Sequence, residues 1–442
     1  MFNLLATTAL AGCDVPAEQT CYVDTPARVM GSAVFDGAIT QEYCAQLCAD
    51  AGKHFAGTEF STQCFCSDKL PAAKKGGRCT MPCSGNAQET CGGNYAIQVY
   101  AVHCSGTPVP PPKKKAEMIN PCINASSVHA KQKWCDAALP IDERVADMVG
   151  RMTLAEKIAN MDTGGAPIAT LGLSKYNWWS EASTGVASGR DTQTTKFAFP
   201  ITTGMAFNRT LWQMTGRQIG REARAMMNAG NGFSTFWAPV INLAREPRWG
   251  RNIETPGEDP YQSGEYAEWY VKGMEKAPED PYHIQASACC KHYVANSMDG
   301  TTQHGIHHDR NHYDATITMQ DLVDSYMKPF QACVEKGEVS GLMCSYNAVN
   351  GVPSCANDWL LTTVAREEWG FDGYVTSDCD ADNDVVFSHH YHNDTPAEGV
   401  RDVLRAGTDV DCGGFVGKYA QAALDNNVRL FTYLYDRLPL PS

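Results

Sequence analysis

The feature that most constrains the fold is an alternation of apolar, strand-like runs with helix-like stretches in the second part of the chain. The strand-like runs occupy residues 233–244, 286–295, 340–349 and 373–378. The helix-like stretches occupy residues 208–229, 260–277, 318–337 and 356–368. Near-continuous apolar strands that alternate with helices are typical of a parallel sheet covered by helices. The chain is therefore expected to be an α/β protein.

Local signals mark several of these helices. Asp259 and Pro260 suit an N-cap and a first helical position. Pro329 is expected to kink the helix in which it lies. The helix over residues 208–229 is expected to bury an apolar stripe formed by Leu211, Met214, Ile219 and Met226.

Two architectures satisfy this alternation, a closed (β/α)8 barrel and an open doubly wound sheet. No Gly-rich phosphate loop follows an early strand, and this favours the barrel. We therefore expect a (β/α)8 TIM-type barrel, imperfect or incomplete, over residues 122–442.

The first hundred residues form a different kind of module. Small domains with little core are usually held together by disulfides. The alternative, a zinc site, also suits C-x-C and C-x3-C spacings, but no paired histidines accompany them. We predict a disulfide-rich domain over residues 18–103, followed by a Pro- and Lys-rich linker over residues 104–121, and a local bridge between Cys122 and Cys135. The cysteines of this domain are Cys21, Cys44, Cys48, Cys64, Cys66, Cys79, Cys83 and Cys91.

Composition restricts the partners and the compartment. The net charge of -14 argues against a nucleic acid partner, since phosphate binding needs clustered positive charge. No apolar run is long enough to cross a bilayer, but residues 1–17 resemble a signal peptide, or a lipoprotein signal with Cys13 as the lipidated residue. The 19 cysteines indicate an oxidising, extracellular compartment, and sequons at Asn124, Asn208 and Asn393 are compatible with a secreted glycoprotein.

Polar side chains stand at the ends of the four apolar runs. Residues 245–251 follow the first run, Lys291 and His292 lie within the second, Tyr346 lies near the end of the third, and Asp378 closes the fourth. The carboxyl ends of barrel strands meet at one face, where active sites lie. The sequence therefore predicts a polar site at that face.

The motifs that carry these residues resemble glycoside hydrolase family 3, closest to its β-xylosidase branch. They are "YNWWSEASTGVA", "EPRWGRNIETPGEDP", "CCKHYVAN", "MCSYNAVNGVPSCAN", "WGFDGYVTSDCDA" and "AGTDVDCG". The cysteine order of the first module is similar to that of a WSC domain, which implies a glycan-binding or cell-wall module. The family 3 resemblance implies an oligosaccharide or polysaccharide substrate, no cofactor, Asp378 as nucleophile, and a sugar pocket lined by Glu181, Arg251, Lys291, His292 and Tyr346.

Physical chemistry supports these roles beside their alternatives. A retaining glycosidase needs an ionised carboxylate that attacks the anomeric carbon, although an Asp after a strand can instead cap the next helix. Arg251 offers a planar fork to vicinal hydroxyls, or pairs with Glu254 or Glu258. Lys291 offers a point charge that can hold Asp378 ionised or bind a hydroxyl. A lysine without a role is disfavoured in an apolar strand, because an unpaired buried ammonium is costly.

The other two candidates are weighed in the same way. His292 can donate to a hydroxyl or be a core residue. Glu181 can accept from a sugar while Trp178 or Trp179 stacks on the ring, although paired tryptophans are more often core.

The second carboxyl group is not identified by a motif. In the family, a following α/β sandwich domain usually supplies the acid/base glutamate, and the chain is expected to lack that domain. Asp380, Asp382 and Glu181 are candidates inside the barrel. Ser183 and Thr184 replace the usual Leu-His, and the loop over residues 296–314 is atypical. Two function classes follow: a secreted retaining glycosidase, or a catalytically weak or inactive glycan-binding wall protein.

Two histidine clusters suggest a weaker, third function, a metal site. His304, His307 and His308 have the spacing of one helical face, and residues 388–392 hold a second group. The first segment is rich in Gly, Asp and Asn and is expected to be a loop, so no metal is predicted.

Overall fold

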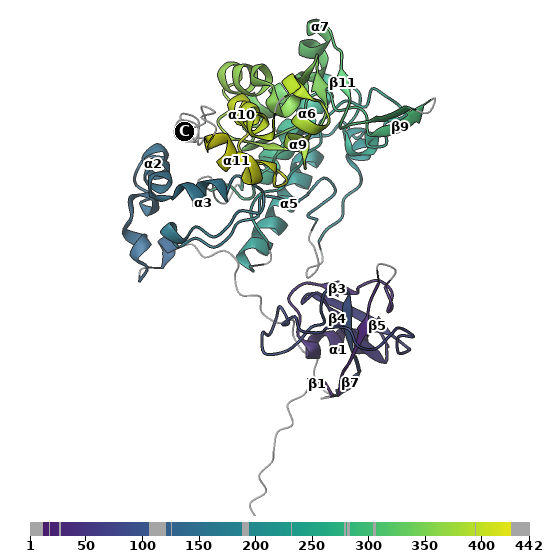
Figure 1. The fold of residues 1–442 in the computed structure, drawn as a ribbon. Coiled ribbons are helices and arrows are strands. Elements are labelled where there is room, and N and C mark those ends of the chain that lie inside the picture. The colour runs from purple at the N-terminus through teal and green to yellow at the C-terminus, as the bar shows by residue number, and fades with distance from the viewer. Residues whose placement is uncertain are drawn as a thin grey trace, which may run out of the picture. The chain divides into compact units, whose positions relative to one another are not determined.

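The structure is a computed structural model that describes residues 12–16, 18–25, 28–105, 121–124, 126–187, 194–230, 232–277, 280, 283–303, 306–393 and 395–425. The chain divides into two compact units, one within residues 1–115 and one that includes residues 116–187 and 194–442 (Figure 1). The expected linker lies almost entirely outside the described residues, as do residues 1–11 of the signal-like segment.

The first unit is a small antiparallel sheet with one helix. Its five-stranded sheet has the order β2-β6-β4-β5-β3, and a separate pair joins β1 to β7. The helix α1 begins after Thr40, whose side chain accepts a hydrogen bond from the Tyr43 N–H. The elements are β1 (Gly12–Asp14), β2 (Thr20–Val23), β3 (Phe35–Asp36), α1 (Gln41–Asp50), β4 (Phe55–Glu59), β5 (Gln63–Ser67), β6 (Ala96–Ala101) and β7 (His103–Ser105).

Disulfides hold this unit together, as predicted. All eight expected cysteines pair among themselves, and a further bridge joins Cys13 to Cys104. Sulfur atoms in disulfides are not thiolate ligands, so the zinc alternative for these cysteines is wrong. The Cys13 bridge is likewise incompatible with a lipid on that sulfur. The four bridges of the expected set are Cys21–Cys79, Cys44–Cys64, Cys48–Cys66 and Cys83–Cys91.

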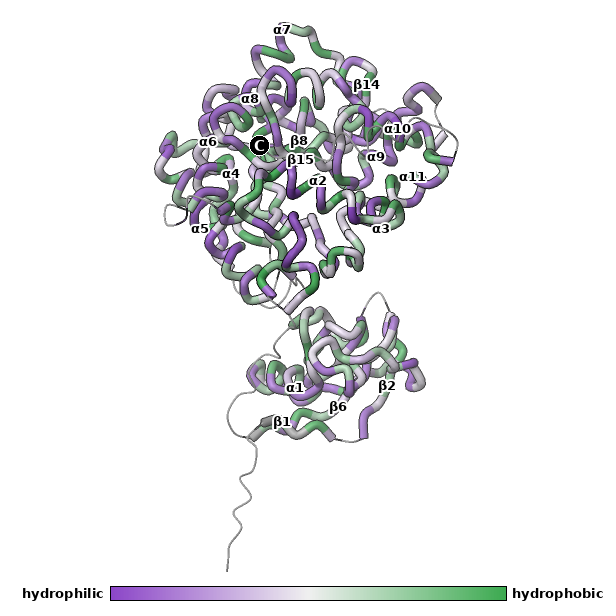
Figure 2. Tube along the Cα trace, turned by 90° about the vertical axis from the view of Figure 1, so that its left-hand side faces the viewer, coloured by the Kyte–Doolittle hydropathy of each residue, from purple (hydrophilic) through white to green (hydrophobic). Residues whose placement is uncertain are grey.

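The second unit is built from short strands surrounded by helices. Figure 2 shows β8 and β15 in the middle of this unit, with α4, α5, α6, α8, α9, α10 and α11 around them. The strands are β8 (Cys290–Tyr293), β9 (Gly300–Gln303), β10 (Ile306–Asp309), β11 (Asp314–Ala315), β12 (Gly341–Cys344), β13 (Ala348–Val349), β14 (Val352–Pro353) and β15 (Tyr374–Ser377). The helices are η1 (Pro121–Ile123), η2 (Val128–Lys131), η3 (Lys133–Cys135), α2 (Ile141–Arg151), α3 (Leu154–Ile158), η4 (Ala169–Leu171), α4 (Pro200–Gly204), α5 (Arg209–Asn228), η5 (Asn252–Glu254), α6 (Pro260–Glu275), α7 (Met319–Asp321), η6 (Leu322–Tyr326), α8 (Lys328–Glu335), η7 (Ser354–Ala356), η8 (Trp359–Glu368), α9 (Ala381–Phe387), η9 (Tyr391–Asn393), α10 (Pro396–Ala406) and α11 (Phe415–Asp425).

The parallel strands β15, β12 and β8 lie side by side in that order and form one part of a barrel wall. Extended segments continue the wall on both sides. Beside β8, Thr235 and Val240 make parallel bridges to residues 287 and 291, and beside β15, Val410 bridges to Thr376.

Backbone contacts between the remaining segments close the wall. Asp411 bridges in parallel to Asp162. The Trp178 N–H donates to the Thr163 carbonyl at 3.0 Å, and the Trp237 N–H donates to the Ser180 carbonyl at 2.8 Å. The series of neighbours therefore returns to its start, and the unit is a TIM-type barrel, as predicted. It is imperfect, because among the described residues only β8, β12 and β15 form continuous ladders in this wall.

Alternate residues of the barrel strands belong to two apolar clusters. Leu342 and Cys344 of β12 pack in the large core that includes α5, α6 and α8. Met343 lies between them in sequence and packs instead with Trp237 and Cys412. Because successive side chains of a strand point to opposite faces, the second cluster fills the barrel interior.

The helices α5 and α6 pack directly against each other, and glycines decide which face of α5 is buried. An added Cβ would lie 2.2 Å from the Tyr270 carbonyl oxygen at Gly216 and 2.3 Å from the Met274 oxygen at Gly220. The buried face of α5 therefore contains glycines together with Trp212 and Ile219. The predicted stripe is wrong at Leu211 and Met214, which are exposed, because a pattern of large apolar residues does not register a glycine contact.

Three local predictions concern the start of α6, the helix around Pro329 and the Cys122–Cys135 bridge. Asp259 caps α6 by accepting from the Gln262 N–H at 2.6 Å, as predicted. The helix expected over residues 318–337 is interrupted before Pro329, where α7, η6 and α8 follow one another. The predicted bridge between Cys122 and Cys135 is present. The remaining bridges of this unit are Cys290–Cys333, Cys344–Cys355 and Cys379–Cys412, while Cys289 is a buried free thiol.

Within the described ranges, no helix combines the length and the apolar character that crossing a bilayer requires.

A buried carboxyl group is expected to make stability depend on pH. Glu275 accepts hydrogen bonds from the Ala288 N–H and from the Ser340 N–H and hydroxyl, and burial raises its pKa to about 7. Between pH 4.5 and 7 the folded state therefore binds more protons than the unfolded state. The free energy of unfolding should fall over this range by up to about 1.4 kcal/mol per pH unit relative to Glu275→Gln.

Chemical denaturation at pH 4.5, 6 and 7.5 measures this difference. Glu335→Gln, at an exposed position of α8, is the matched control and should follow the wild-type curve. A wild-type chain whose stability rises relative to Glu275→Gln from pH 4.5 to 7 would contradict the expectation.

Candidate active site

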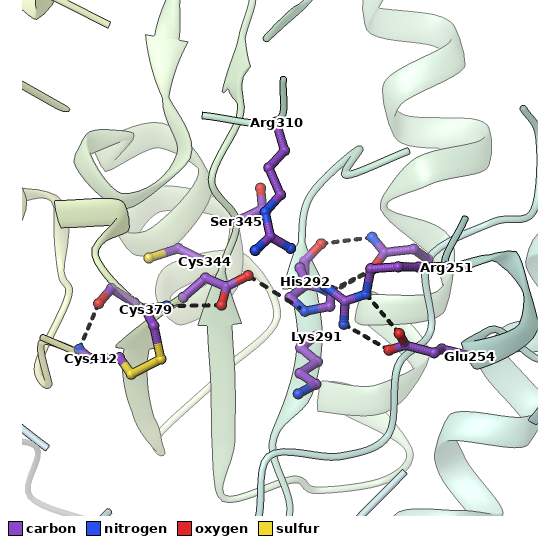
Figure 3. A network of polar contacts seen from close by, with 12 residues as sticks. Arg251, Glu254, Lys291, His292, Arg310, Cys344, Ser345, Cys379 and Cys412 are labelled. Carbon is purple, nitrogen blue, oxygen red and sulfur yellow. Dashed lines mark hydrogen bonds and ion pairs between the residues drawn. A yellow bond between two sulfur atoms is a disulfide. The ribbon is translucent and has the colours of Figure 1, made fainter. Parts of the chain in front are cut away.

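Asp378 lies directly after β15, at the carboxyl end of the barrel strands. Its backbone N–H donates to the Cys344 carbonyl at 3.0 Å, which continues the pairing of β15 with β12 by one residue. Its side chain is only 12% exposed. Oδ1 accepts from the Cys379 N–H at 2.9 Å, and Oδ2 lies 3.6 Å from Nε2 of His292 (Figure 3). Asp380, not Asp378, occupies the N-cap position of α9, so the capping alternative for Asp378 is wrong.

A disulfide holds the segment that follows Asp378. Cys379 is bonded to Cys412, and the Asp380 N–H donates to the Cys412 carbonyl at 2.6 Å. The Cys412 N–H in turn donates to the Ser377 hydroxyl. The carboxylate is therefore presented by a backbone that is fixed on both sides.

Lys291 and Glu181 form an ion pair at the same end of the barrel. Nζ of Lys291 lies 2.6 Å from Oε2 of Glu181. The lysine side chain is 4% exposed, whereas the glutamate side chain is 37% exposed. The ammonium thus has the partner that its burial requires, and the glutamate is the member of the pair that faces solvent.

His292 is fully buried and is held by Asn242. The His292 N–H donates to Oδ1 of Asn242 at 2.7 Å, and Nδ1 lies 3.1 Å from the same oxygen. Nδ2 of Asn242 donates to the His292 carbonyl at 2.8 Å. Burial, together with the charges of Arg251, Lys291 and Arg310, lowers the pKa of His292 well below its ordinary value. The imidazole is therefore neutral.

Arg251 is paired with Glu254 through two hydrogen bonds. Nε and one terminal nitrogen of the guanidinium lie 2.8 and 2.7 Å from the two carboxylate oxygens. The ion pair between Arg251 and Glu254, one of the alternatives for Arg251, is thus present. Figure 3 shows the guanidinium beside His292. The pair occupies only two of the five donors of the guanidinium, so it can orient Arg251 without preventing contact with a ligand.

Tyr346 and Arg310 complete the group around Asp378. The Arg310 guanidinium carbon lies 4.2 Å from the centroid of the Tyr346 ring. Burial and the negative charge of Asp378 raise the pKa of Tyr346 above its ordinary value, so the phenol remains protonated. Arg310 also pairs with Asp299 at 3.6 Å.

The structure thus brings all six residues predicted for the site to one end of the barrel, and adds Arg310 and Asn242. A sequence signal existed for Asn242, a polar residue at the end of an apolar run. No such signal marks Arg310, since it follows β10 in the loop that looked atypical.

The charges around Asp378 are arranged in pairs. Each nearby cation has its own carboxylate: Lys291 with Glu181, Arg251 with Glu254, and Arg310 with Asp299. Burial raises the pKa of Asp378 above its ordinary value, while the charges of Lys291 and Arg251 act in the opposite direction. Asp378 is the one carboxylate of this group without a lysine or arginine partner within ion-pair distance among the described residues.

The two tryptophans predicted beside Glu181 differ in environment. Trp178 packs against the ring of Tyr374 at 5.1 Å and belongs to the barrel interior. Trp179 is 54% exposed, and its Nε1 lies 3.4 Å from Oε1 of Glu181. Trp178 is therefore core, and Trp179 offers an open ring face next to Glu181.

The three barrel candidates for a second reactive carboxyl differ in burial and in their partners. Asp382 is 0% exposed, and burial and the charge of Asp411 raise its pKa well above the ordinary value. Asp380 is exposed and has a left-handed backbone with φ 66°. Glu181 is bound to Lys291.

The described part of the first histidine cluster is a strand. Residues 306–309 form β10, so the loop expected for this segment is wrong there, and the helical spacing of His307 and His308 is not realised; His304 lies outside the described residues. In the second cluster, Nε2 of His389 lies 2.8 Å from the Tyr346 carbonyl. In the described part of the chain, the clusters within ligand distance are Cys44, Cys48 and Cys64, and Cys344, Cys355 and Asp382. Their cysteines are in disulfides.

Comparisons with known proteins agree with this arrangement. Residues 178–413 match the glycosyl hydrolase family 3 N terminal domain, and residues 19–93 match the WSC domain. Beta-D-xylosidase 1 of Arabidopsis thaliana is 41% identical over 311 residues, which is 69% of this chain and 39% of that protein. Beta-xylosidase/alpha-L-arabinofuranosidase 1 of Medicago sativa subsp. varia is 42% identical over 300 residues, which is 66% of this chain and 38% of that protein.

Among solved structures, a GH3 exo-beta-xylosidase (XlnD) in complex with a xylobiose aziridine activity-based probe is similar with a TM-score of 0.66 and 33% identity. The similarity covers 73% of this chain and 43% of that one. This chain thus spans about two fifths of the length of the relatives that it matches. It belongs to glycosyl hydrolase family 3 and carries a WSC domain.

Proposed function

We propose that this member of glycosyl hydrolase family 3 is a retaining glycoside hydrolase that removes β-linked xylose from xylan oligosaccharides, with Asp378 as its nucleophile. The observation that supports the proposal most strongly is the buried Asp378 carboxylate at the end of a barrel strand, among Lys291, His292, Arg251 and Tyr346. Within the described ranges this carboxylate has no lysine or arginine at ion-pair distance. Xylose as the sugar rests on relatives that are named as β-xylosidases.

The proposed reaction is a double displacement. Oδ2 of Asp378 attacks the anomeric carbon, the bond to the leaving oxygen breaks, and the sugar is held as an ester on Asp378. A water molecule then attacks the same carbon and releases one proton to solvent, the ester bond breaks, and the carboxylate is restored. Configuration is retained because the carbon is inverted twice. The chain's neutral and charged donors bind the sugar: Arg251 and Lys291 donate to hydroxyls, and Glu181 accepts from one.

Departure of the leaving group needs a proton, and no motif assigns a carboxyl group of this chain to that role. Glu181, Glu254 and Asp299 are each paired with a cation. Burial raises the pKa of Asp299. General acid catalysis typically contributes about 10² to 10⁴-fold in rate. The rate at which the chain cleaves a glycoside is therefore expected to depend strongly on the acidity of the leaving group.

A 2,4-dinitrophenyl β-xyloside tests the proposal because its leaving group needs no proton. The expected result is a burst of dinitrophenol equal to the protein concentration, with a mass increase of one xylosyl unit on the peptide that contains Asp378. Absence of both burst and label with correctly folded protein would overturn the proposal. The same assay on a β-glucoside tests the choice of sugar.

A second candidate function is a glycan-binding protein with little or no hydrolysis. The ion pairs of Glu181, Glu254 and Asp299 favour it, since a site in which these carboxylates are engaged can bind a sugar without a proton donor for the leaving group. Saturable binding of xylo-oligosaccharides without burst or label would support this alternative.

The setting proposed for the chain is extracellular. Its nine disulfides need an oxidising compartment. The WSC domain is proposed to bind a wall or substrate glycan and to keep the barrel near it.

The raised pKa of Asp378 predicts the acid limb of the pH profile. Attack requires the ionised carboxylate, and burial raises the pKa of Asp378. The kcat/KM of the free protein should therefore fall with decreasing pH at a value above the roughly pH 4 of an ordinary aspartate. Assays of the dinitrophenyl xyloside from pH 3 to 8 measure it. An acid limb below pH 4 would contradict the expectation, and Lys291→Met should move the limb upward.

A further inference from the structure

Asn242 makes three contacts with His292. It lies just after the segment that bridges to residue 291, and it is 3% exposed. Its amide oxygen faces the backbone N–H and Nδ1 of His292, and its amide nitrogen faces the His292 carbonyl. Two of these three contacts are to backbone groups.

Those backbone contacts fix which way the amide points. A backbone N–H only donates and a carbonyl only accepts, so Oδ1 of Asn242 must face the His292 N–H and Nδ2 must face the His292 carbonyl. Rotating the amide would place donor against donor and acceptor against acceptor. Oδ1 is therefore an acceptor 3.1 Å from Nδ1 of the His292 ring, and Nδ1 carries the proton.

We propose that Asn242 is a positioning residue that holds His292 as the Nδ1–H tautomer, so that Nε2 presents a bare lone pair to the sugar site and accepts a hydrogen bond from a ring hydroxyl. This reverses the donor role that the sequence analysis considered for His292. The hydroxyl part of the inference rests on the proposed function, and the tautomer part does not.

The surroundings of the ring support the neutral form. Positive charges of Arg251, Lys291 and Arg310 lie near it and oppose a second ring proton. Nε2 faces Oδ2 of Asp378 at 3.6 Å (Figure 3). With the carboxylate ionised, two acceptors face each other across a distance too long for a hydrogen bond. A polyol can donate one hydroxyl proton to Nε2 of His292 and another to Oδ2 of Asp378. The site therefore favours a ligand with neighbouring hydroxyl groups.

The tautomer is measured directly by long-range ¹H–¹⁵N correlation spectra of the whole chain with ¹⁵N-labelled histidine. His292→Gln identifies the signals of this ring. The expected result between pH 5 and 8 is a pyrrole-type Nδ1 and a pyridine-type Nε2. A protonated Nε2, alone or in an imidazolium, would overturn the inference, whether or not the chain hydrolyses xylosides.

Variants test whether Asn242 sets this state. Asn242→Asp adds a negative charge beside Nδ1 and removes the donor to the His292 carbonyl, so a second proton should appear on Nε2. Asn242→Ala should mix the two tautomers. Asn357→Ala is the matched control: Asn357 is also buried and accepts from a backbone N–H, that of Leu360, but it does not contact His292. Its His292 signals should remain those of the wild type.

Activity measurements distinguish the positioning role of Asn242 from the proposed hydrolase function. On the dinitrophenyl xyloside, Asn242→Ala should lower kcat/KM about tenfold, mainly through KM, as expected for one lost hydrogen bond. Wild-type signals in Asn242→Ala and Asn242→Asp would overturn the positioning role. The expected tautomer in a chain that shows no burst would support the role of Asn242 and count against the proposed function alone.

Discussion

Replacing Asp378 with alanine is expected to lower kcat/KM on the dinitrophenyl xyloside by about 10³-fold or more, because the covalent route is lost while the sugar pocket remains. Alanine is preferred to asparagine, since an asparagine can deamidate back to aspartate. The side chain of Asp378 accepts a hydrogen bond from the neighbouring Cys379 N–H, and burial disfavours its charged form. Its removal should therefore change the thermal midpoint little.

Added azide provides a second, chemical readout for Asp378→Ala. The space left by the carboxylate should admit azide, which attacks the anomeric carbon once and inverts it. The expected product is the α-xylosyl azide, detectable by NMR, with a partial return of dinitrophenol release. An inverted azide product identifies the face from which Asp378 acts in the wild type.

Asp380→Asn is the matched control for this experiment. Asp380 lies two residues further on, is exposed, and has the left-handed backbone that asparagine tolerates well. It should retain wild-type kcat/KM. Equal losses at Asp378 and Asp380, or full activity in Asp378→Ala, would contradict the assignment of the nucleophile.

The position of Asp378 could be predicted because two independent signals agree at that residue. An apolar run ends there, and the family motif places an aspartate there. Lys291 is similar, since an ammonium in an apolar strand needs a partner, and the structure supplies Glu181. In both cases burial makes the polar residue costly without a specific role, and this is why the sequence is informative.

The parts that could not be predicted depend on backbone geometry rather than on residue type. The apolar run over residues 233–244 predicts a regular strand. In the structure, residues 235–240 are joined to the neighbouring segment by isolated bridges. The buried face of α5 depends on how closely Gly216 and Gly220 approach α6. Arg310 reaches the site because the hairpin of β9 and β10 precedes it, and no periodicity in residues 296–314 indicates that hairpin.

The difference in burial between Lys291 and Glu181 predicts an asymmetric effect on stability. Glu181→Gln leaves an ammonium that is 4% exposed without its partner, whereas Lys291→Met leaves a carboxylate that is 37% exposed and partly hydrated. Breaking a buried pair by removing one partner costs about 3 to 5 kcal/mol. We expect Glu181→Gln to lower the free energy of unfolding by about 3 kcal/mol and Lys291→Met to lower it clearly less. The free energy of unfolding of the double variant should be close to that of Lys291→Met.

Activity should follow a different order from stability, and this separates a structural pair from a functional one. Lys291→Met removes a donor to the sugar and a charge that favours ionised Asp378, so the double variant should regain stability without regaining kcat/KM. Denaturant unfolding and xyloside kinetics on the four chains measure both quantities. The exposed pair Lys53–Asp68 in the first unit is the control, with a coupling of about 1 kcal/mol or less. Additive stability losses would show that Lys291 and Glu181 are not coupled energetically, which would contradict the expected asymmetry. Activity restored in the double variant would show that the pair serves the fold alone.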